Sequence, residues 1–187
     1  MVALETPQID ENWQAPDFSL KGTDGKTYSL DDVKGENGLL VMFICNHCPY
    51  VKAITDKIIR DARQLQDLGV GVVAINSNDA DKYPEDSFEN MQKLAQDKDF
   101  PFPYLFDSSQ NVAKTYGAVC TPDFFGFNRD LQLEYRGRLD DSGMNNDPAA
   151  VRDLFNAMSQ VAQLDKGPRV QYPSIGCSIK WKGQADG

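Results

Sequence analysis

Several features that would point to common functions are scarce in this sequence. Among its 187 residues there is one histidine, His47, and it lies between two cysteines, which excludes a serine triad and most other hydrolase constellations. Four cysteines are too few for a scaffold held together by disulfides. No apolar run approaches the ~20 residues that cross a bilayer, so no membrane-spanning helix is expected.

Positive charge is scarce as well. The chain has 19 Lys and Arg against 28 Asp and Glu, a net charge of -9 and a pI near 4.5. Nucleic acid or an anionic membrane surface would repel such a chain, so neither is expected as a partner. Residues 1–14 hold no basic region followed by an apolar stretch, which favours a cytoplasmic protein. An exported protein whose signal peptide had been removed would look the same.

The overall composition is that of an ordinary globular protein. Hydrophobic residues make up 41% of the chain and charged residues 25%. The length and composition predict a single domain over 1–187. Its core lies at about 17–164, and residues 165–187, with their prolines and glycines, form an irregular C-terminal extension.

Elements of two kinds alternate along the chain. Two apolar runs, 39–44 and 70–75, flank a segment of helical spacing that starts at Pro49 and is ended by Gly69. Such a crossover makes the two strands parallel neighbours, so the fold class is α/β. Further elements are predicted as hairpins at 18–30 and 124–138, helices at 85–97, 110–116 and 148–164, and a short strand at 104–106.

The turn between the first of these strands and its helix carries the sequence Cys45-Asn46-His47-Cys48. Two thiols at this spacing can close a small disulfide ring. A free thiol with a pKa of about 8.5 is only slightly ionised at neutral pH, and the positive end of a helix that begins at Pro49 favours the thiolate. His47 can add a positive charge between the cysteines. The turn is therefore typical of a redox-active dithiol.

Other interpretations of these residues remain open. The two thiols can be half of a zinc site completed by Cys120 and Cys177, although a second C-x-x-C pair is missing. His47 can be a solvated turn residue without a catalytic role.

Three segments resemble the thioredoxin superfamily, and in particular its peroxiredoxin-like, AhpC/TSA-like redoxin branch. They are Ala15-Pro16-Asp17-Phe18, the Cys45–Cys48 tetrad and Val119-Cys120-Thr121-Pro122, and the resemblance extends over about 17–164. It implies a thioredoxin-like fold: a central mixed β-sheet flanked by helices, with an N-terminal β-hairpin and the C-terminal extension.

The resemblance also implies roles for Thr121 and Pro122. In the family the corresponding peptide bond is cis and packs beside the dithiol. Thr121 would offer its backbone to a disulfide substrate in a short strand-like contact, and Pro122 would shape that groove.

The chain departs from both branches of the superfamily. Where thioredoxins carry a buried carboxylate and a tryptophan, this chain has Leu39 and Ile44. Peroxiredoxins have a T-x-x-C pattern and a distant arginine, but Cys45 takes the place of that threonine and residues 118–127 contain no arginine. Fast peroxide reduction is therefore not expected.

The two resemblances nominate different nucleophiles. Comparison with thioredoxins nominates Cys45, which is usually the more exposed sulfur, whereas comparison with peroxiredoxins nominates Cys48. We favour Cys45. Cys120 and Cys177 are possible additional redox thiols, and the sequence does not tell whether Cys177 reaches the dithiol.

These observations predict a thiol–disulfide oxidoreductase that cycles Cys45 and Cys48 between dithiol and disulfide. The alternatives are a peroxiredoxin-like thiol peroxidase that uses Cys48 and a metal-binding or redox-sensing module. No organic cofactor is expected, because no glycine-rich phosphate loop follows a strand. Substrates would be thiols or disulfides, in proteins or small molecules, and the reducing partner would be a protein or a small thiol.

Overall fold

The protein is described from a computed structural model. The structure describes residues 2–8, 10 and 13–185. The predictions for the N-terminal segment and for the extension fall in part on residues 1, 9, 11, 12, 186 and 187, which lie outside the described residues.

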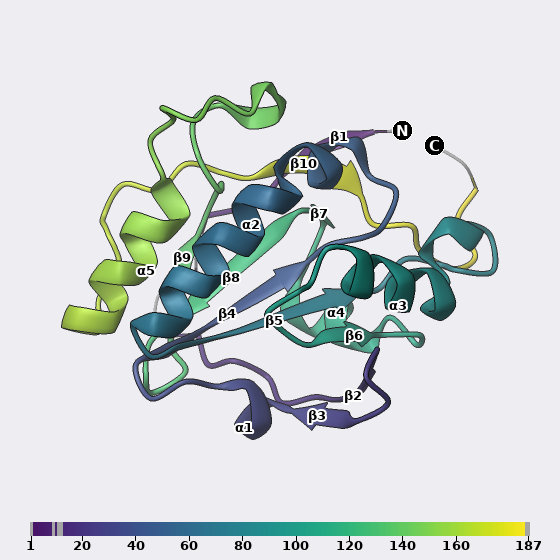
Figure 1. Cartoon of the computed structure of the whole chain (residues 1–187), viewed down its shortest axis with the longest axis horizontal. Helices are drawn as coiled ribbons and strands as arrows, with labels where there is room; N and C mark the ends of the chain where they lie inside the picture. Colours follow the sequence, from purple (N-terminus) through teal and green to yellow (C-terminus); the bar gives the residue numbers. More distant parts are fainter. Residues whose placement is uncertain (1, 9, 11–12, 186–187) are drawn as a thin grey trace.

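A seven-stranded sheet with strand order β3-β2-β6-β5-β4-β8-β9 forms the centre of the molecule (Figure 1). Strands β4, β5 and β6 are parallel, and the remaining pairs are antiparallel, so the sheet is mixed, as expected. The strands are β2 (Ser19–Gly22), β3 (Thr27–Ser29), β4 (Gly38–Phe43), β5 (Val70–Asn76), β6 (Tyr104–Phe106), β8 (Asp123–Phe127) and β9 (Leu133–Arg136).

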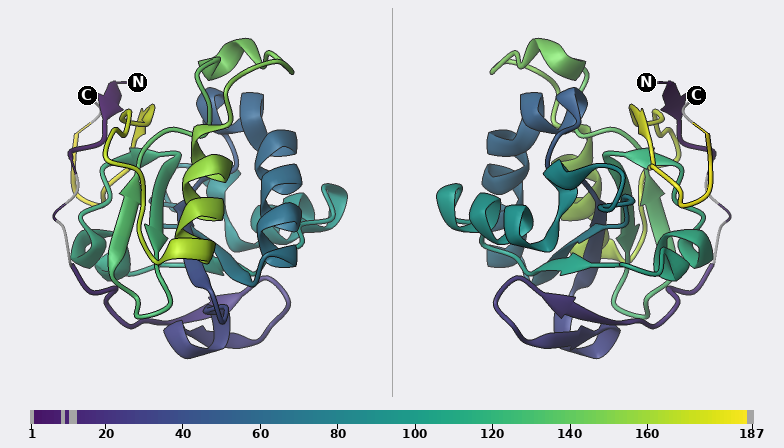
Figure 2. Two further views of the ribbon diagram at one scale, coloured as in Figure 1. Left: turned by 90° about the vertical axis from the view of Figure 1, so that its left-hand side faces the viewer. Right: turned by 90° about the vertical axis from the view of Figure 1, so that its right-hand side faces the viewer.

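Helices cover both faces of this sheet, which explains why β4 is apolar at every position. Leu40 and Met42 face a core shared with α2 (Pro49–Asp67), α3 (Phe88–Asp97) and α5 (Asp153–Leu164). The alternate residues Leu39, Val41 and Phe43 face a second core shared with α1 (Leu30–Val33) and α4 (Asn111–Tyr116). Figure 2 shows α2 and α5 side by side on one face. Among the described helices, none has both the length and the apolar character needed to span a bilayer.

The helix that follows the dithiol begins where the sequence predicts. Cys48 is the N-cap residue of α2 and Pro49 is its first helical residue, where a proline loses no hydrogen bond. Gly69, with a φ of 82°, ends the turn after the helix in a conformation that favours glycine.

Two predicted helices differ in their extent. The predicted helix 85–97 is a short 3₁₀ turn, η1 (Pro84–Asp86), followed by α3, because the Ser87 hydroxyl accepts a hydrogen bond from the Asn90 amide and caps the new helix. The predicted helix 148–164 begins only at Asp153. The preceding amide of Val151 is instead bonded to the Asp141 carboxylate, in the loop that carries η2 (Gly143–Asn145).

The C-terminal extension is more ordered than predicted. It contains strand β10 (Ile175–Ser178), which pairs antiparallel with β1 (Ala3–Glu5) on one side and with β7 (Cys120–Thr121) on the other. Strand β10, yellow in Figure 1, lies beside β1 near the start of α2. A four-residue strand has too little alternation to be recognised in sequence, and its partners are distant in the chain. This small sheet brings the extension to the dithiol.

Candidate active site

The two cysteines of the C-x-x-C motif lie in a buried turn between β4 and α2. Cys45 is 1% exposed and Cys48 is fully buried. Both side chains are buried, so exposure does not distinguish the two sulfurs. All four cysteines of the chain are free thiols in the structure.

Thr121 and Pro122 lie against the dithiol. The peptide bond between them is cis, as the resemblance implies. The Cys45 sulfur is 3.3 Å from the Thr121 hydroxyl oxygen, and the Cys48 sulfur is 3.3 Å from the Thr121 carbonyl oxygen. The structure thus brings four of the predicted site residues together.

Cys177 reaches the dithiol, which the sequence left open. Its sulfur lies 2.8 Å from that of Cys48 and close enough for a hydrogen bond. Cys120 is fully buried, and its sulfur contacts the Pro122 carbonyl at 3.6 Å. Burial raises the pKa of the Cys120 thiol far above its ordinary value, so it stays protonated.

The surroundings shift the pKa values of the two motif cysteines in opposite directions. A hydrogen bond from the Cys45 thiol is the main cause that lowers the pKa of Cys48, to about 4, and contacts with Cys177 and with the Val51 amide act in the same direction. The pKa of Cys45 is raised well above its ordinary value, first by this hydrogen bond to Cys48 and then by burial. When the pair loses a proton, the hydrogen bond therefore favours the negative charge on Cys48 over Cys45.

His47 is bound to a carboxylate that sequence reasoning missed. Its Nδ1 atom is 2.5 Å from Oδ2 of the buried Asp86, and this contact raises the pKa of His47. The imidazole also stacks on the Tyr83 ring, with 5.7 Å between the ring centroids and 3° between the planes. The contacts with Asp86 and Tyr83 thus fix the His47 side chain, which is not a solvated turn residue.

Asp86 is fully buried and organises the turn between the cysteines. Its Oδ1 atom accepts a hydrogen bond from the Asn46 amide at 2.7 Å, and Asn76 and Asn78 donate to the same carboxylate. The carboxyl ends of the parallel strands β4 and β5 meet at one edge of the sheet. This topology is the signal that could have drawn attention to acidic residues shortly after β5.

The cysteines do not form the four-thiol zinc site considered above. In the described part of the chain, the group that could hold a metal ion consists of Cys45, His47 and Asp86, whose ligand atoms lie within 4.8 Å of one another. His47 and Asp86 already bind each other within this group.

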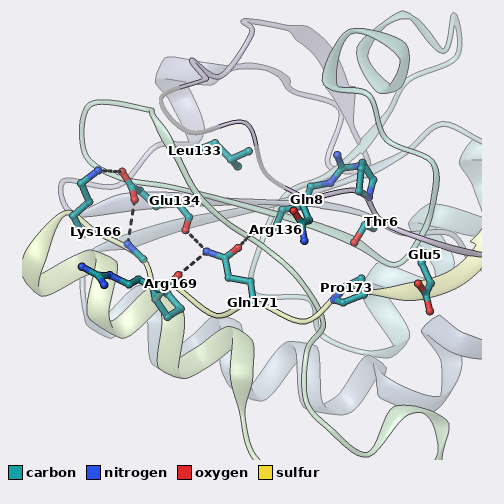
Figure 3. A pocket seen from close by; sticks show the side chains of 13 residues that line it. Glu5, Thr6, Gln8, Leu133, Glu134, Arg136, Lys166, Arg169, Gln171 and Pro173 are labelled. Atoms are coloured by element: carbon teal, nitrogen blue, oxygen red, sulfur yellow. Dashed lines mark hydrogen bonds and ion pairs between the residues drawn. The ribbon is translucent and has the colours of Figure 1, made fainter.

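A cavity of about 360 Å³ is bordered by Tyr50 and Pro122, which lie close in sequence to Cys48 and Thr121, although neither motif cysteine lines it. Tyr50, Ile54, Pro122 and Phe124 give it apolar walls, and Ile175 of β10 borders it. This volume lies within the range of small-molecule sites. A second, more polar cavity, of about 870 Å³, lies between β9 and residues 166–173 (Figure 3). All four cysteines are among the described residues, and none of them lines it.

A dithiol beside a cis-proline, in a mixed sheet with helices on both faces, defines a protein with a thioredoxin-like fold, and solved structures of that class match this chain. The expected fold is confirmed. Residues 12–136 match the AhpC/TSA family, and the chain belongs to that family.

Known proteins extend this assignment. The crystal structure of an uncharacterized conserved protein from Geobacillus kaustophilus is 48% identical, covers 99% of both chains and has a TM-score of 0.93. The thioredoxin-like protein YneN of Bacillus subtilis is 34% identical over 61% of this chain and 63% of its own length. A putative peroxiredoxin, bcp, of Coxiella burnetii is 30% identical over 63% of this chain and 73% of its own. This chain therefore matches less than two thirds of YneN, and the comparisons support a redox function in general.

Proposed function

We propose that the protein is a thiol–disulfide oxidoreductase that cycles Cys45 and Cys48 between dithiol and disulfide. The observation that carries this proposal is the pair of thiols at the start of α2, in which the Cys45 thiol stabilises a Cys48 thiolate. A thiolate is the species that attacks a disulfide.

The same electrostatics assign the order of the two steps. The Cys48 thiolate attacks one sulfur of a disulfide substrate, forms a mixed disulfide and releases the other sulfur as a thiolate. Cys45 then loses its proton to the released thiolate and attacks the Cys48 sulfur, so that the Cys45–Cys48 disulfide forms and the second substrate sulfur leaves as a thiolate that takes a proton from water. This order is the reverse of the one that comparison with thioredoxins favours.

His47 and Asp86 support the reaction by position and charge. Asp86 raises the pKa of His47, and the imidazolium lies in the same turn as the Cys48 thiolate, which further favours the charged ring. We infer that His47 helps to hold the negative charge that passes between the sulfurs. No cofactor is needed for these steps.

The substrates are thiols and disulfides, and an external thiol reduces the protein again. The apolar cavity of about 360 Å³ beside Pro122 is where the organic part of a small substrate would lie. Larger apolar groups would contact Tyr50 and Ile54 on α2.

Replacement of Cys48 by serine tests the proposal. We expect Cys48→Ser to lose at least 100-fold of the turnover of a small disulfide with a dithiol reductant, because the thiolate that attacks the substrate is gone. The matched control is Cys120→Ala, which removes an equally buried thiol that contacts a carbonyl oxygen, and it should keep most of the activity. Unchanged turnover in Cys48→Ser would contradict the proposed cycle.

A second candidate function is thiol peroxidase activity of Cys48. Its lowered pKa favours this role, and one relative is named a putative peroxiredoxin. Against it, Arg136 on β9 is paired with the buried Asp123 at 2.9 Å. Trapping of a sulfenic acid at Cys48 after stoichiometric peroxide would support it. Peroxide consumption no faster than that of a free thiol would exclude it.

A further inference from the structure

Residues 167–171 fasten the C-terminal segment to strand β9. The Gln171 side-chain amide donates to the Glu134 carbonyl at 2.8 Å and its oxygen accepts from the Arg136 amide at 2.9 Å. The Gly167 amide donates to the Glu134 carboxylate at 3.2 Å. Figure 3 shows these bonds along one wall of the larger cavity. The segment that leads to β10 is therefore held in place.

Strand β10 itself lies directly on the residues beside the dithiol. Cys177 is in register with Thr121, and the Ser174 hydroxyl donates to the Pro122 carbonyl at 2.8 Å. A Cβ atom on Gly176 would lie 2.0 Å from the Thr121 carbonyl oxygen, so only glycine allows this approach. The backbone of β10 occupies the edge of Thr121 that would otherwise be open to another strand.

This docking places the Cys177 thiol against Cys48. The two sulfurs, 2.8 Å apart, are about 0.8 Å further apart than in a disulfide bond. Both side chains are buried. Cys48 caps helix α2 and Cys177 lies on strand β10, so ordered secondary structure holds both sulfurs in place. Groups held in contact react as if present at very high concentration.

We propose that Cys177 is a third redox-active thiol of this site, and that the protein has a second disulfide state, Cys48–Cys177, which exchanges with Cys45–Cys48. This inference rests on the proposed function, because the proposed cycle produces the Cys45–Cys48 disulfide from which the exchange starts. It adds a residue from the C-terminal segment to the reacting atoms.

The exchange needs no additional oxidant. Cys177 gives up its proton and attacks the Cys48 sulfur of the Cys45–Cys48 disulfide. The Cys48–Cys177 bond forms, the Cys45–Cys48 bond breaks, and Cys45 leaves with the electron pair and takes up the proton. Cys177 can resolve a mixed disulfide on Cys48 in the same way, with the substrate thiol as the leaving group.

The charges around Cys177 agree with this order of events. In the reduced protein, burial and the hydrogen bond to Cys48 raise the pKa of Cys177 to about 12, so it is a proton donor to Cys48. Once Cys48 is in a disulfide, its thiolate no longer raises the pKa of Cys177. The nearby Lys180 then favours the Cys177 thiolate.

The test uses Cys45→Ser, in which Cys48 has no motif partner. After treatment with oxidised glutathione, we expect Cys48–Cys177 in most of the protein and little glutathione adduct, as measured by alkylation and peptide mapping. In Cys45→Ser/Cys177→Ala, one glutathione per chain should remain on Cys48, an increase of at least tenfold. Cys45→Ser/Cys120→Ala is the matched control and should behave like Cys45→Ser. A stable adduct on Cys48 with Cys177 free to alkylation would overturn the inference.

The unaltered chain gives a second test that does not depend on the folding of a cysteine variant. When it is oxidised, both Cys45–Cys48 and Cys48–Cys177 should be found, and Gly176→Ala, which removes no thiol, should reduce the second at least tenfold. Finding only Cys45–Cys48 would overturn the inference and leave the proposed function standing. Finding only Cys48–Cys177 would instead contradict the proposed Cys45/Cys48 cycle.

Discussion

The carboxylate of Asp86 fixes the positions of the two residues between the cysteines, Asn46 and His47. It binds the Asn46 amide and the His47 ring at once, although it belongs to a different segment of the chain. Glu85 and the Cys48 thiolate also face His47 and favour its charged form, but the contact with Asp86 is the largest cause of its raised pKa.

We expect Asp86→Asn to lower the pKa of His47 and to destabilise the fold by about 1–3 kcal/mol, because a buried charged acceptor is lost. The chain has one histidine, so a single imidazole resonance reports this pKa by NMR. The pKa of His47 is raised in the fold, so its contribution to stability is complete below the unfolded value of about 6.5 and is lost as pH rises through the folded value.

The destabilisation by Asp86→Asn should accordingly be larger at pH 5.5 than at pH 9. Asp31→Asn, at an exposed carboxylate paired with Lys34, is the control and should leave the histidine resonance unchanged. An unaltered His47 titration in Asp86→Asn would show that Asp86 does not set its charge.

At the scale of elements, a buried lysine joins α2 to the loop around η2. The ammonium of Lys57 donates to the Asp140 carboxylate at 2.6 Å, to the Ser142 hydroxyl at 3.0 Å and to the Asp147 carbonyl at 2.9 Å. Residues 140–144 of this loop line the cavity that Pro122 borders. Helix α2, which Cys48 caps, therefore also fixes one wall of the proposed substrate site.

Lys57→Met should lower the free energy of unfolding by about 3 kcal/mol, because it leaves the Asp140 carboxylate buried without its partner. Lys98→Met, at an exposed ion pair with Asp56, should cost less than about 1 kcal/mol. Denaturant unfolding measures both. Equal effects of the two substitutions would mean that the buried pair does not hold the loop.

The sequence predicts those elements whose signal is local. The apolar run 39–44, the helix from Pro49 and the second strand at 70–75 are found within one or two residues of their predicted bounds. Strand β10, the binding of Asp86 to His47 and the contact of Cys177 with Cys48 depend on pairing across the fold. No spacing in the chain encodes them, so they could not be predicted.

At the scale of the whole molecule, the contact between Cys48 and Cys177 joins residues 129 positions apart. A disulfide here would close a long loop of the unfolded chain and reduce its entropy. The Cys45–Cys48 disulfide closes only the short turn and constrains the unfolded chain little.

Oxidised Cys45→Ser should therefore be more stable than its reduced form by about 5 kcal/mol, the value expected for a loop of this length. The matched protein is Cys177→Ala, which can form only the short disulfide and should gain much less on oxidation. Denaturant unfolding with and without reductant gives both differences. A similar gain in the two proteins would show that no long-range disulfide had formed.

The small sheet β1-β10-β7 also fixes the order in which the site can be assembled during synthesis. Cys45 and Cys48 are translated more than a hundred residues before β10. Until β10 has been made, the nascent chain carries the dithiol without the strand that covers Thr121, and at first without Thr121 itself. During that interval both thiols are more exposed than in the finished fold, where Cys45 and Cys48 are buried. Brief alkylation of stalled nascent chains should therefore label Cys48 faster than in the folded protein, where this side chain is fully buried.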